Sequence, residues 1–142
     1  MPFSVAVLDE AYYGMLSLER ATRLCTAAFS AQGIDAERLG EVSVALVLVP
    51  VIHDLNLKYR GIDAPTDVLS FELDGLHGEM VGEVVVAPEY VASDPAGVEE
   101  LVVHGALHLA GMDHGEDFGG SEMAAVQKRV LRSVGARERD VS

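Results

Sequence analysis

The chain of 142 residues is long enough for one domain with one core, and hydrophobic residues make up 49% of it. Its longest nearly apolar run, residues 42–52, is too short to cross a bilayer and contains Ser43 and Pro50, so the sequence indicates no membrane span. Ten basic against 23 acidic residues give a net charge of −13, which by itself disfavours a polyanionic partner.

Hydrophobic spacing and turn residues predict four strands and four helices. In chain order these are a strand over residues 3–8, a helix over 17–31, a strand over 41–49, a helix over 51–59, strands over 67–73 and 81–87, a helix over about 98–110 and a helix over 122–134. Ser17 and Ser121 are the expected N-caps of the first and last helix, and Gly33, Gly61 and Gly111 are expected to end helices.

The order of these elements indicates the fold class. Two strands follow each other directly after residue 61, so the strict alternation of a doubly wound parallel sheet is absent. The chain contains no internal repeat or linker. We therefore expect one α+β domain over residues 1–142, in which a small mixed sheet of about four strands packs with about four helices. The polar tail after residue 135 is expected to fray.

The single cysteine and the N-terminal residues bear on location. Cys25 has no partner for a disulfide, which agrees with a reducing compartment. The chain reaches Asp9 and Glu10 without a basic residue, unlike a signal peptide. These features predict a cytoplasmic protein, in which Cys25 is a small apolar residue on a helix.

Three of the five histidines lie within eleven residues, in the segment HGALHLAGMDH that begins at His104. His104 and His108 are four residues apart, so a helix presents both imidazoles on one face. A left-handed turn at Gly111 then returns His114 as the third ligand. The alternative is that each histidine forms one ordinary hydrogen bond, and this interpretation is kept for His53 and for His77.

Three imidazole ligands without cysteine indicate one zinc ion per chain, held on a helix and its following loop, with one coordination position left open. The spacing H-x-x-x-H-x-x-G-x-x-H is also that of the metzincin metalloproteases. Those enzymes carry glutamate as general base directly after the first histidine, where this chain has Gly105. The spacing therefore favours a metal site and disfavours a peptidase.

The histidine segment closely resembles the signature of the YbeY endoribonucleases, HG-x-LHL-x-G-x-DH. Two further segments resemble motifs of that family and occur in the family's order. They are LNLKYR at residues 55–60, followed by PTDVLSF at 65–71, and GEVVVAPE at 82–89. The resemblance covers about residues 42–134.

This resemblance implies a metal-dependent, single-strand-specific endoribonuclease that acts in rRNA maturation and ribosome quality control. It also implies a small α+β fold with a four-stranded sheet and a histidine zinc site at one end of a cleft. The family's arginine across that cleft, which is needed for activity, corresponds to Arg60. Arg60 and His114 are thus the expected catalytic residues, and Arg60 and Lys58 are expected to bind substrate.

Four nearby polar residues have two interpretations each. Asp113 could orient an imidazole behind the metal, or it could be solvated. Thr66, Asp67 and Ser70 could be catalytic polar groups, chiefly as support for the cleft, although a turn followed by a strand explains them equally well. Whether water or a ribose 2′-OH attacks the phosphate stays open, because the sequence offers no unmistakable general base.

The charge distribution sets a condition on any RNA substrate. Residues 61–127 contain no lysine or arginine but 14 acidic residues. An anionic substrate must then be held by the metal, by Lys58 and Arg60, or by the basic segment 128–139. We expect weak binding to free RNA and recruitment through the ribosome or a ribosomal protein. A zinc peptidase or amidohydrolase, and a non-catalytic ribosome-associated zinc protein, remain as alternatives.

Overall fold

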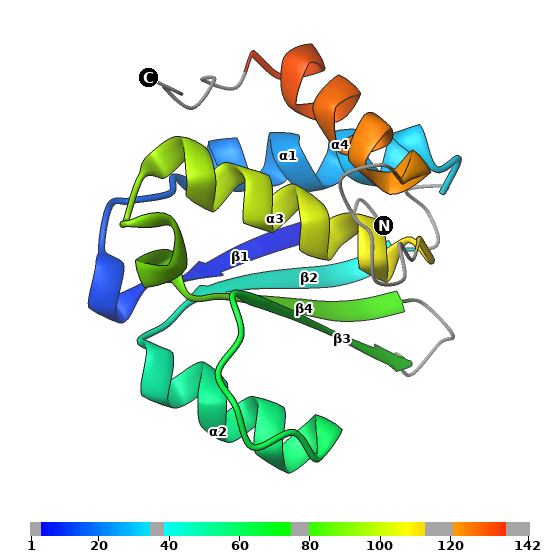
Figure 1. Cartoon of the computed structure of the whole chain (residues 1–142). Helices are drawn as coiled ribbons and strands as arrows, with labels where there is room; N and C mark the ends of the chain where they lie inside the picture. Colours follow the sequence, from blue (N-terminus) through cyan, green and yellow to red (C-terminus); the bar gives the residue numbers. More distant parts are fainter. Residues whose placement is uncertain (1–3, 35–38, 75–79, 113–120, 136–142) are drawn as a thin grey trace.

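The computed structural model describes residues 4–34, 39–74, 80–112 and 121–135 (Figure 1). Four strands and four helices lie in these ranges, as the sequence predicts, together with two short 3-10 helices. The elements in chain order are β1 (Ser4–Leu8), η1 (Glu10–Tyr12), α1 (Leu18–Ala31), β2 (Leu39–Leu46), α2 (Val49–Arg60), β3 (Val68–Asp74), β4 (Met80–Val86), η3 (Pro88–Val91), α3 (Pro95–Leu109) and α4 (Glu122–Ser133).

The four strands form one mixed sheet in the order β1-β2-β4-β3. β1, β2 and β4 run parallel, whereas β3 pairs antiparallel with β4, with Ser70 opposite Val84. This confirms the predicted α+β class, because β3 and β4 are consecutive and share no helical crossover. β3 is therefore an edge strand, open along one side.

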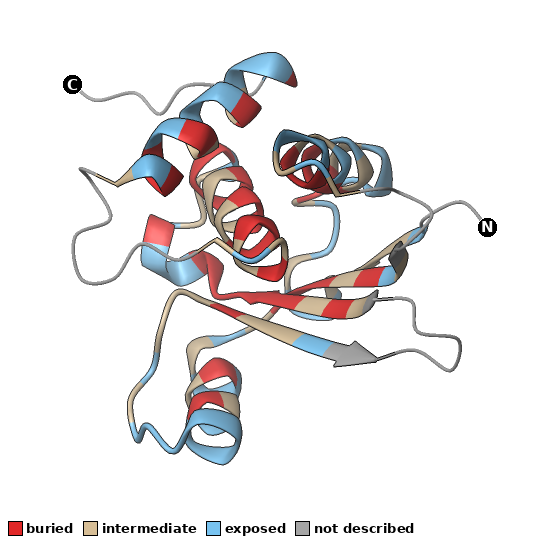
Figure 2. Cartoon of the chain, turned by 90° about the vertical axis from the view of Figure 1, so that its right-hand side faces the viewer, coloured by how far each residue is buried: buried red, intermediate tan, exposed pale blue. Residues whose placement is uncertain are grey.

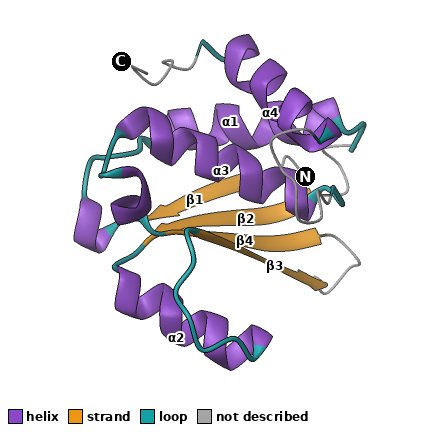
Figure 3. Ribbon diagram, in the orientation of Figure 1, coloured by secondary structure: helices purple, strands orange, loops and turns teal. Residues whose placement is uncertain are grey.

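Helices cover the two faces of the sheet unequally (Figure 3). α1, α3 and α4 lie on one face, while α2 lies alone on the other. The main core fills the three-helix side, where its largest fully buried side chains include Phe29, Leu24, Leu107 and Met123. A smaller cluster around Ile52 lies beneath α2. Figure 2 shows α3 as mostly buried and α2 as largely exposed.

Two glycines let α3 approach the sheet closely. A Cβ atom at Gly105 would lie 2.5 Å from Val84 Cγ1, and one at Gly82 would lie 2.7 Å from Leu109 Cδ1. Ser70 Oγ also donates a hydrogen bond of 2.8 Å to the Gly105 carbonyl oxygen. The face of α3 that carries Gly105 is thus fixed against β3 and β4.

Two predicted boundaries are wrong, and a proline lies beside each. The strand predicted to reach residue 49 ends at Leu46, and α2 begins at Val49 with Pro50 in its first turn. The helix predicted from about residue 98 begins at Pro95, after Asp94, whose side chain accepts from the amide of Ala96. Proline lacks an amide hydrogen that the first turn would leave unpaired in any case, so it suits the first turn of both helices.

The predicted helix caps agree with the structure better than these two boundaries do. The Ser17 and Ser121 hydroxyl oxygens accept from the amides of Arg20 and Ala124. Gly61 and Gly111 have positive φ angles of 70° and 96°, as the left-handed turns after α2 and α3 require. None of the helices within the described ranges is both long and apolar enough to cross a membrane. The tail predicted to fray lies outside those ranges.

Candidate functional site

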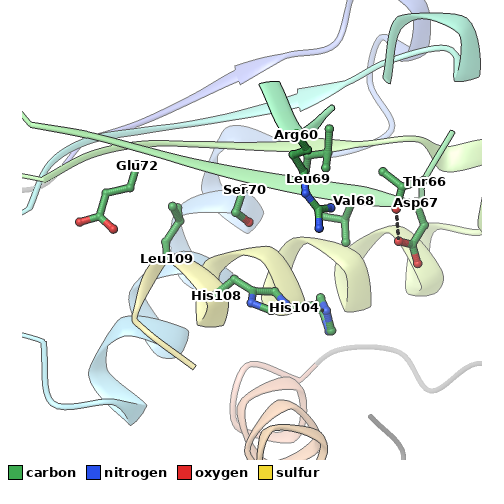
Figure 4. Close-up of a pocket in the computed structure, with 10 residues that line it drawn as sticks. All are labelled: Arg60, Thr66, Asp67, Val68, Leu69, Ser70, Glu72, His104, His108 and Leu109. Atoms are coloured by element: carbon green, nitrogen blue, oxygen red, sulfur yellow. Dashed lines mark hydrogen bonds between the residues drawn. The ribbon is translucent and has the colours of Figure 1, made fainter. Parts of the chain in front are cut away.

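A cleft of about 510 Å³ lies beside the edge strand β3 (Figure 4). The C-terminal end of α2 and the outer face of α3 approach this cleft from opposite sides. Its lining consists of Arg60, Thr66, Asp67, Val68, Leu69, Ser70, Glu72, His104, His108 and Leu109. The structure therefore brings together residues that are more than forty positions apart in the sequence.

His104 and His108 lie one helical turn apart on α3, as their spacing predicts. Their Nε2 atoms are 3.2 Å apart, and their ring centroids are separated by 4.8 Å. Two nitrogen ligands of one tetrahedral zinc ion lie about 3.3 Å apart, since each zinc–nitrogen distance is about 2.05 Å. The imidazole pair thus has the nitrogen separation that a shared zinc ion needs.

The third expected ligand, His114, and the neighbouring Asp113 lie outside the described residues. Among the residues that are described, no group of three or more metal-binding side chains converges. The structure does describe the turn that ends α3 at Gly111 and Met112. The amides of Gly111 and Met112 donate to the carbonyl oxygens of His108 and Leu107, so the chain leaves α3 in a tight left-handed turn.

The end of α2 holds Arg60 at the cleft. Gly61 caps the helix, and the amide of Ile62 donates back to the carbonyl oxygen of Asn56. The Asn56 side chain is buried and donates a 2.8 Å hydrogen bond to the carbonyl oxygen of Ala64. These bonds fix the turn that follows Arg60, while the Arg60 side chain itself is exposed and extends into the cleft.

Neighbouring contacts anchor this end of α2 further. The Tyr59 ring meets Phe71 of β3 edge-to-face, with centroids 5.2 Å apart. His53 Nε2 lies 2.8 Å from a carboxylate oxygen of Asp63, which fits the ordinary structural role expected for this histidine. The Lys58 ammonium lies 5.2 Å from the centroid of the Tyr59 ring, and Lys58 does not line the cleft.

Ser70 and Thr66, two of the polar residues predicted to belong to the site, both lie at the cleft. Ser70 lines the cleft, and its hydroxyl group binds the backbone of α3 at Gly105, not an imidazole. Thr66 also lines the cleft, and its hydroxyl lies 3.4 Å from the carboxylate of Asp67. Their roles in catalysis stay predictions.

Two residues at the site lacked a usable sequence signal. Glu72 lines the cleft because alternate residues of β3 face α3, which only the strand's orientation reveals. Gln127 of α4 lies against His104, with 3.1 Å between Gln127 Oε1 and His104 Nδ1. Nothing in the spacing between α3 and α4 predicts that contact.

Cys25 takes no part in this site. It is fully buried in the core, and burial raises the pKa of its thiol to about 12. The thiol stays protonated near neutral pH, so it is neither a nucleophile nor a metal ligand there.

The Endoribonuclease YbeY family matches residues 14–135, which is most of the chain and more than the three short motifs cover. The chain belongs to this family. The family match includes β2, β3, β4 and all four helices, and therefore every described element that lines the cleft.

Individual relatives agree with this assignment. The chain is 63% identical over 138 residues to Endoribonuclease YbeY of Rubrobacter xylanophilus, a match that covers 96% of this chain and all of the relative. It is 37% identical to Endoribonuclease YbeY of Moorella thermoacetica, over 84% of this chain and 88% of that one.

A solved structure supports the fold. The solution structure of TM1509 from Thermotoga maritima matches with a TM-score of 0.56 and 29% identity, and covers 97% of this chain and 98% of its own.

Proposed function

We propose that this protein is a zinc-dependent endoribonuclease that cleaves single-stranded RNA during rRNA maturation and ribosome quality control. Membership of the Endoribonuclease YbeY family supports the endoribonuclease activity. The buried Cys25 and the absence of a membrane-spanning helix from the described ranges agree with a cytoplasmic location.

One observation carries this proposal. The paired Nε2 atoms of His104 and His108 and the side chain of Arg60 face a single open cleft from opposite sides. A metal centre opposite a permanent cation suits a phosphodiester, which carries negative charge and gains more in the transition state.

The residues have distinct roles in the proposed reaction. His104 and His108, with His114 as the third ligand, would hold zinc. When bound, zinc supplies Lewis acidity toward a phosphoryl oxygen or a water molecule. Arg60 donates hydrogen bonds to the phosphate and stabilises the charge that develops on it. Lys58 contacts the RNA backbone outside the cleft.

The packing of Gly105 argues against the peptidase alternative. A zinc peptidase with this histidine spacing needs a glutamate side chain at that position. Here the position faces β4, and even a Cβ atom would lie 2.5 Å from Val84 Cγ1. The fold therefore has no room for that general base, and Gly105 serves the close approach of helix and sheet.

The acidic charge of the chain suggests how it would reach its substrate. Asp67 and Glu72 line the same cleft as Arg60, so the site attracts free RNA only weakly. We propose that a ribosomal protein or another ribosomal component brings the enzyme to its RNA. The contribution of the chain itself is then local, through zinc, Arg60 and Lys58.

The test uses the purified protein with its metal content measured. Single-stranded RNA, duplex RNA and casein are incubated with the zinc-loaded protein and with protein stripped by a chelator. We expect cleavage of single-stranded RNA alone, its loss on stripping, and its return with added zinc. Cleavage of casein would favour the peptidase. Bound zinc without any cleavage would favour a non-catalytic ribosomal protein.

A further inference from the structure

A residue of the last helix, Gln127, contacts His104 of the proposed metal site at the ring nitrogen that lies away from His108. Gln127 lies on α4, which follows α3 after the intervening segment 110–121. Its Oε1 atom lies 3.1 Å from Nδ1 of His104, the ring nitrogen that does not face His108. Both side chains are half-buried.

The contact determines which nitrogen of His104 carries the proton. A neutral imidazole has one N–H donor and one acceptor nitrogen, and a metal binds only the acceptor. The amide oxygen of Gln127 can only accept, so it selects the form with hydrogen on Nδ1. Nε2 then keeps its lone pair and points toward Nε2 of His108, where the proposed zinc ion binds.

The opposite orientation of the amide would have the opposite effect. An amide N–H donated to Nδ1 would place the hydrogen on Nε2 of His104 and block metal binding there. The observed geometry, with Oε1 toward Nδ1, is the one that leaves the site ready for metal. Partners of this kind also hold the imidazole ring in a fixed orientation.

The core holds Gln127 in place. Its neighbours Met123, Val126 and Val130 on the same face of α4 are all buried, with exposed fractions of 0%, 3% and 3%. The helix start is fixed by the Ser121 cap. An apolar residue at position 127 would extend this face, so the polar side chain there is not explained by packing alone.

We propose that Gln127 is a positioning residue for the metal site, which accepts a hydrogen bond from His104 Nδ1–H and so keeps the hydrogen off Nε2, the nitrogen that would bind zinc. This inference rests on the zinc site of the proposed function. It makes α4 part of the metal centre, although none of the expected ligands comes from α4.

The experiment measures zinc affinity of the purified chain by competition with a chelator, independently of RNA cleavage. Gln127→Met keeps the length of the side chain and removes the acceptor. We expect it to weaken zinc binding about 10- to 100-fold. Gln127→Glu keeps an acceptor and should bind zinc at least as tightly as the natural protein. Ala125→Met, at an exposed position of the same helix, is the matched control and should change nothing.

Two results would overturn the proposal. One is unchanged zinc affinity in Gln127→Met, and the other is equal weakening in Gln127→Met and Gln127→Glu, which would indicate packing and not the acceptor. If Gln127→Met does not fold, ¹⁵N NMR of the zinc-free natural protein decides the matter. Hydrogen on Nδ1 of His104 supports the proposal, and hydrogen on Nε2 overturns it.

The outcomes separate this inference from the proposed function. Zinc binding that depends on Gln127, in a protein that cleaves no RNA, would support the inference and contradict the endoribonuclease activity. RNA cleavage by a protein whose zinc affinity is unchanged by substitution of Gln127 would support the endoribonuclease activity and contradict the inference.

Discussion

Helices α2 and α3 approach the same edge strand from opposite faces of the sheet, yet they are packed very differently. Ten of the fifteen residues of α3 are buried, against two of the twelve residues of α2. Two of the proposed metal ligands, His104 and His108, lie on the buried helix, and the proposed substrate-binding cation lies at the end of the exposed one. Metal geometry needs positions that are held rigidly, whereas a long arginine side chain can adjust to its substrate.

The largest effect is expected at the metal. His108→Ala removes one of two imidazoles whose nitrogens lie 3.2 Å apart, so bound zinc should fall from about one ion per chain to nearly none, and RNA cleavage with it. Elemental analysis of the purified protein measures this. His53→Ala is the control, because His53 pairs with Asp63 and does not line the cleft, and it should keep its zinc. Full zinc occupancy in His108→Ala would contradict the site.

The next effect tests the exposed side of the comparison. Arg60→Ala should lower the rate of RNA cleavage by about 10²- to 10³-fold, the usual loss when one group that stabilises developing charge is removed. Zinc content and thermal unfolding should stay unchanged, because the side chain is exposed. Arg23→Ala, at an exposed position of α1 away from the cleft, loses the same charge and should cleave normally. Unimpaired cleavage by Arg60→Ala would remove the central cation from the mechanism.

The same substitution on the two helices tests the packing difference itself. Leu107→Ala on α3 removes a fully buried side chain and should lower the free energy of unfolding by about 2–5 kcal/mol. Leu57→Ala on α2 removes a side chain that is 48% exposed and should change it by no more than about 0.5 kcal/mol. Urea unfolding of both zinc-free variants provides the comparison. Similar losses would mean that α2 supports the fold as much as α3 does.

The sequence predicts local features of this molecule well. The helical spacing of His104 and His108, the serine caps and the glycine turns depend on residues within a few positions of one another, and the structure agrees with each. The boundary errors lie beside Pro50 and Pro95. Proline suits the first turn of a helix, but the residue at which the helix begins depends on the contacts of the residues before the proline.

Features that depend on distant contacts could not be predicted. The sequence shows at Gly105 only that a general base is missing, whereas the structure shows that this position packs closely against Val84 of β4. The contact between Gln127 and His104 joins two helices whose relative placement follows from the core. Only the family resemblance predicts that Arg60 faces the histidines. The order of the strands brings α2 and α3 to the same edge of the sheet, and local sequence patterns do not reveal that order.

The smallest expected effect concerns salt. Among the described residues that line the cleft, Arg60 is the one cation, beside the carboxylates of Asp67 and Glu72. If Arg60 and Lys58 neutralise about two phosphates, the logarithm of the affinity for single-stranded RNA should fall with the logarithm of salt concentration with a slope of about −1.4. Raising the salt from about 50 to 200 mM would then weaken binding only about sevenfold.

Fluorescence anisotropy of a labelled single-stranded RNA, titrated with the zinc-loaded protein at several salt concentrations, measures this slope. Arg60→Ala should make it shallower by about 0.7, the share of one phosphate contact, and Arg23→Ala should leave it unchanged. A slope of about −4 or steeper would indicate six or more phosphate contacts. Binding would then involve cations outside the cleft, and the basic segment 128–139 would be the first candidate for them. In that case the chain would reach RNA through its own surface, and the need for recruitment by a ribosomal partner would disappear.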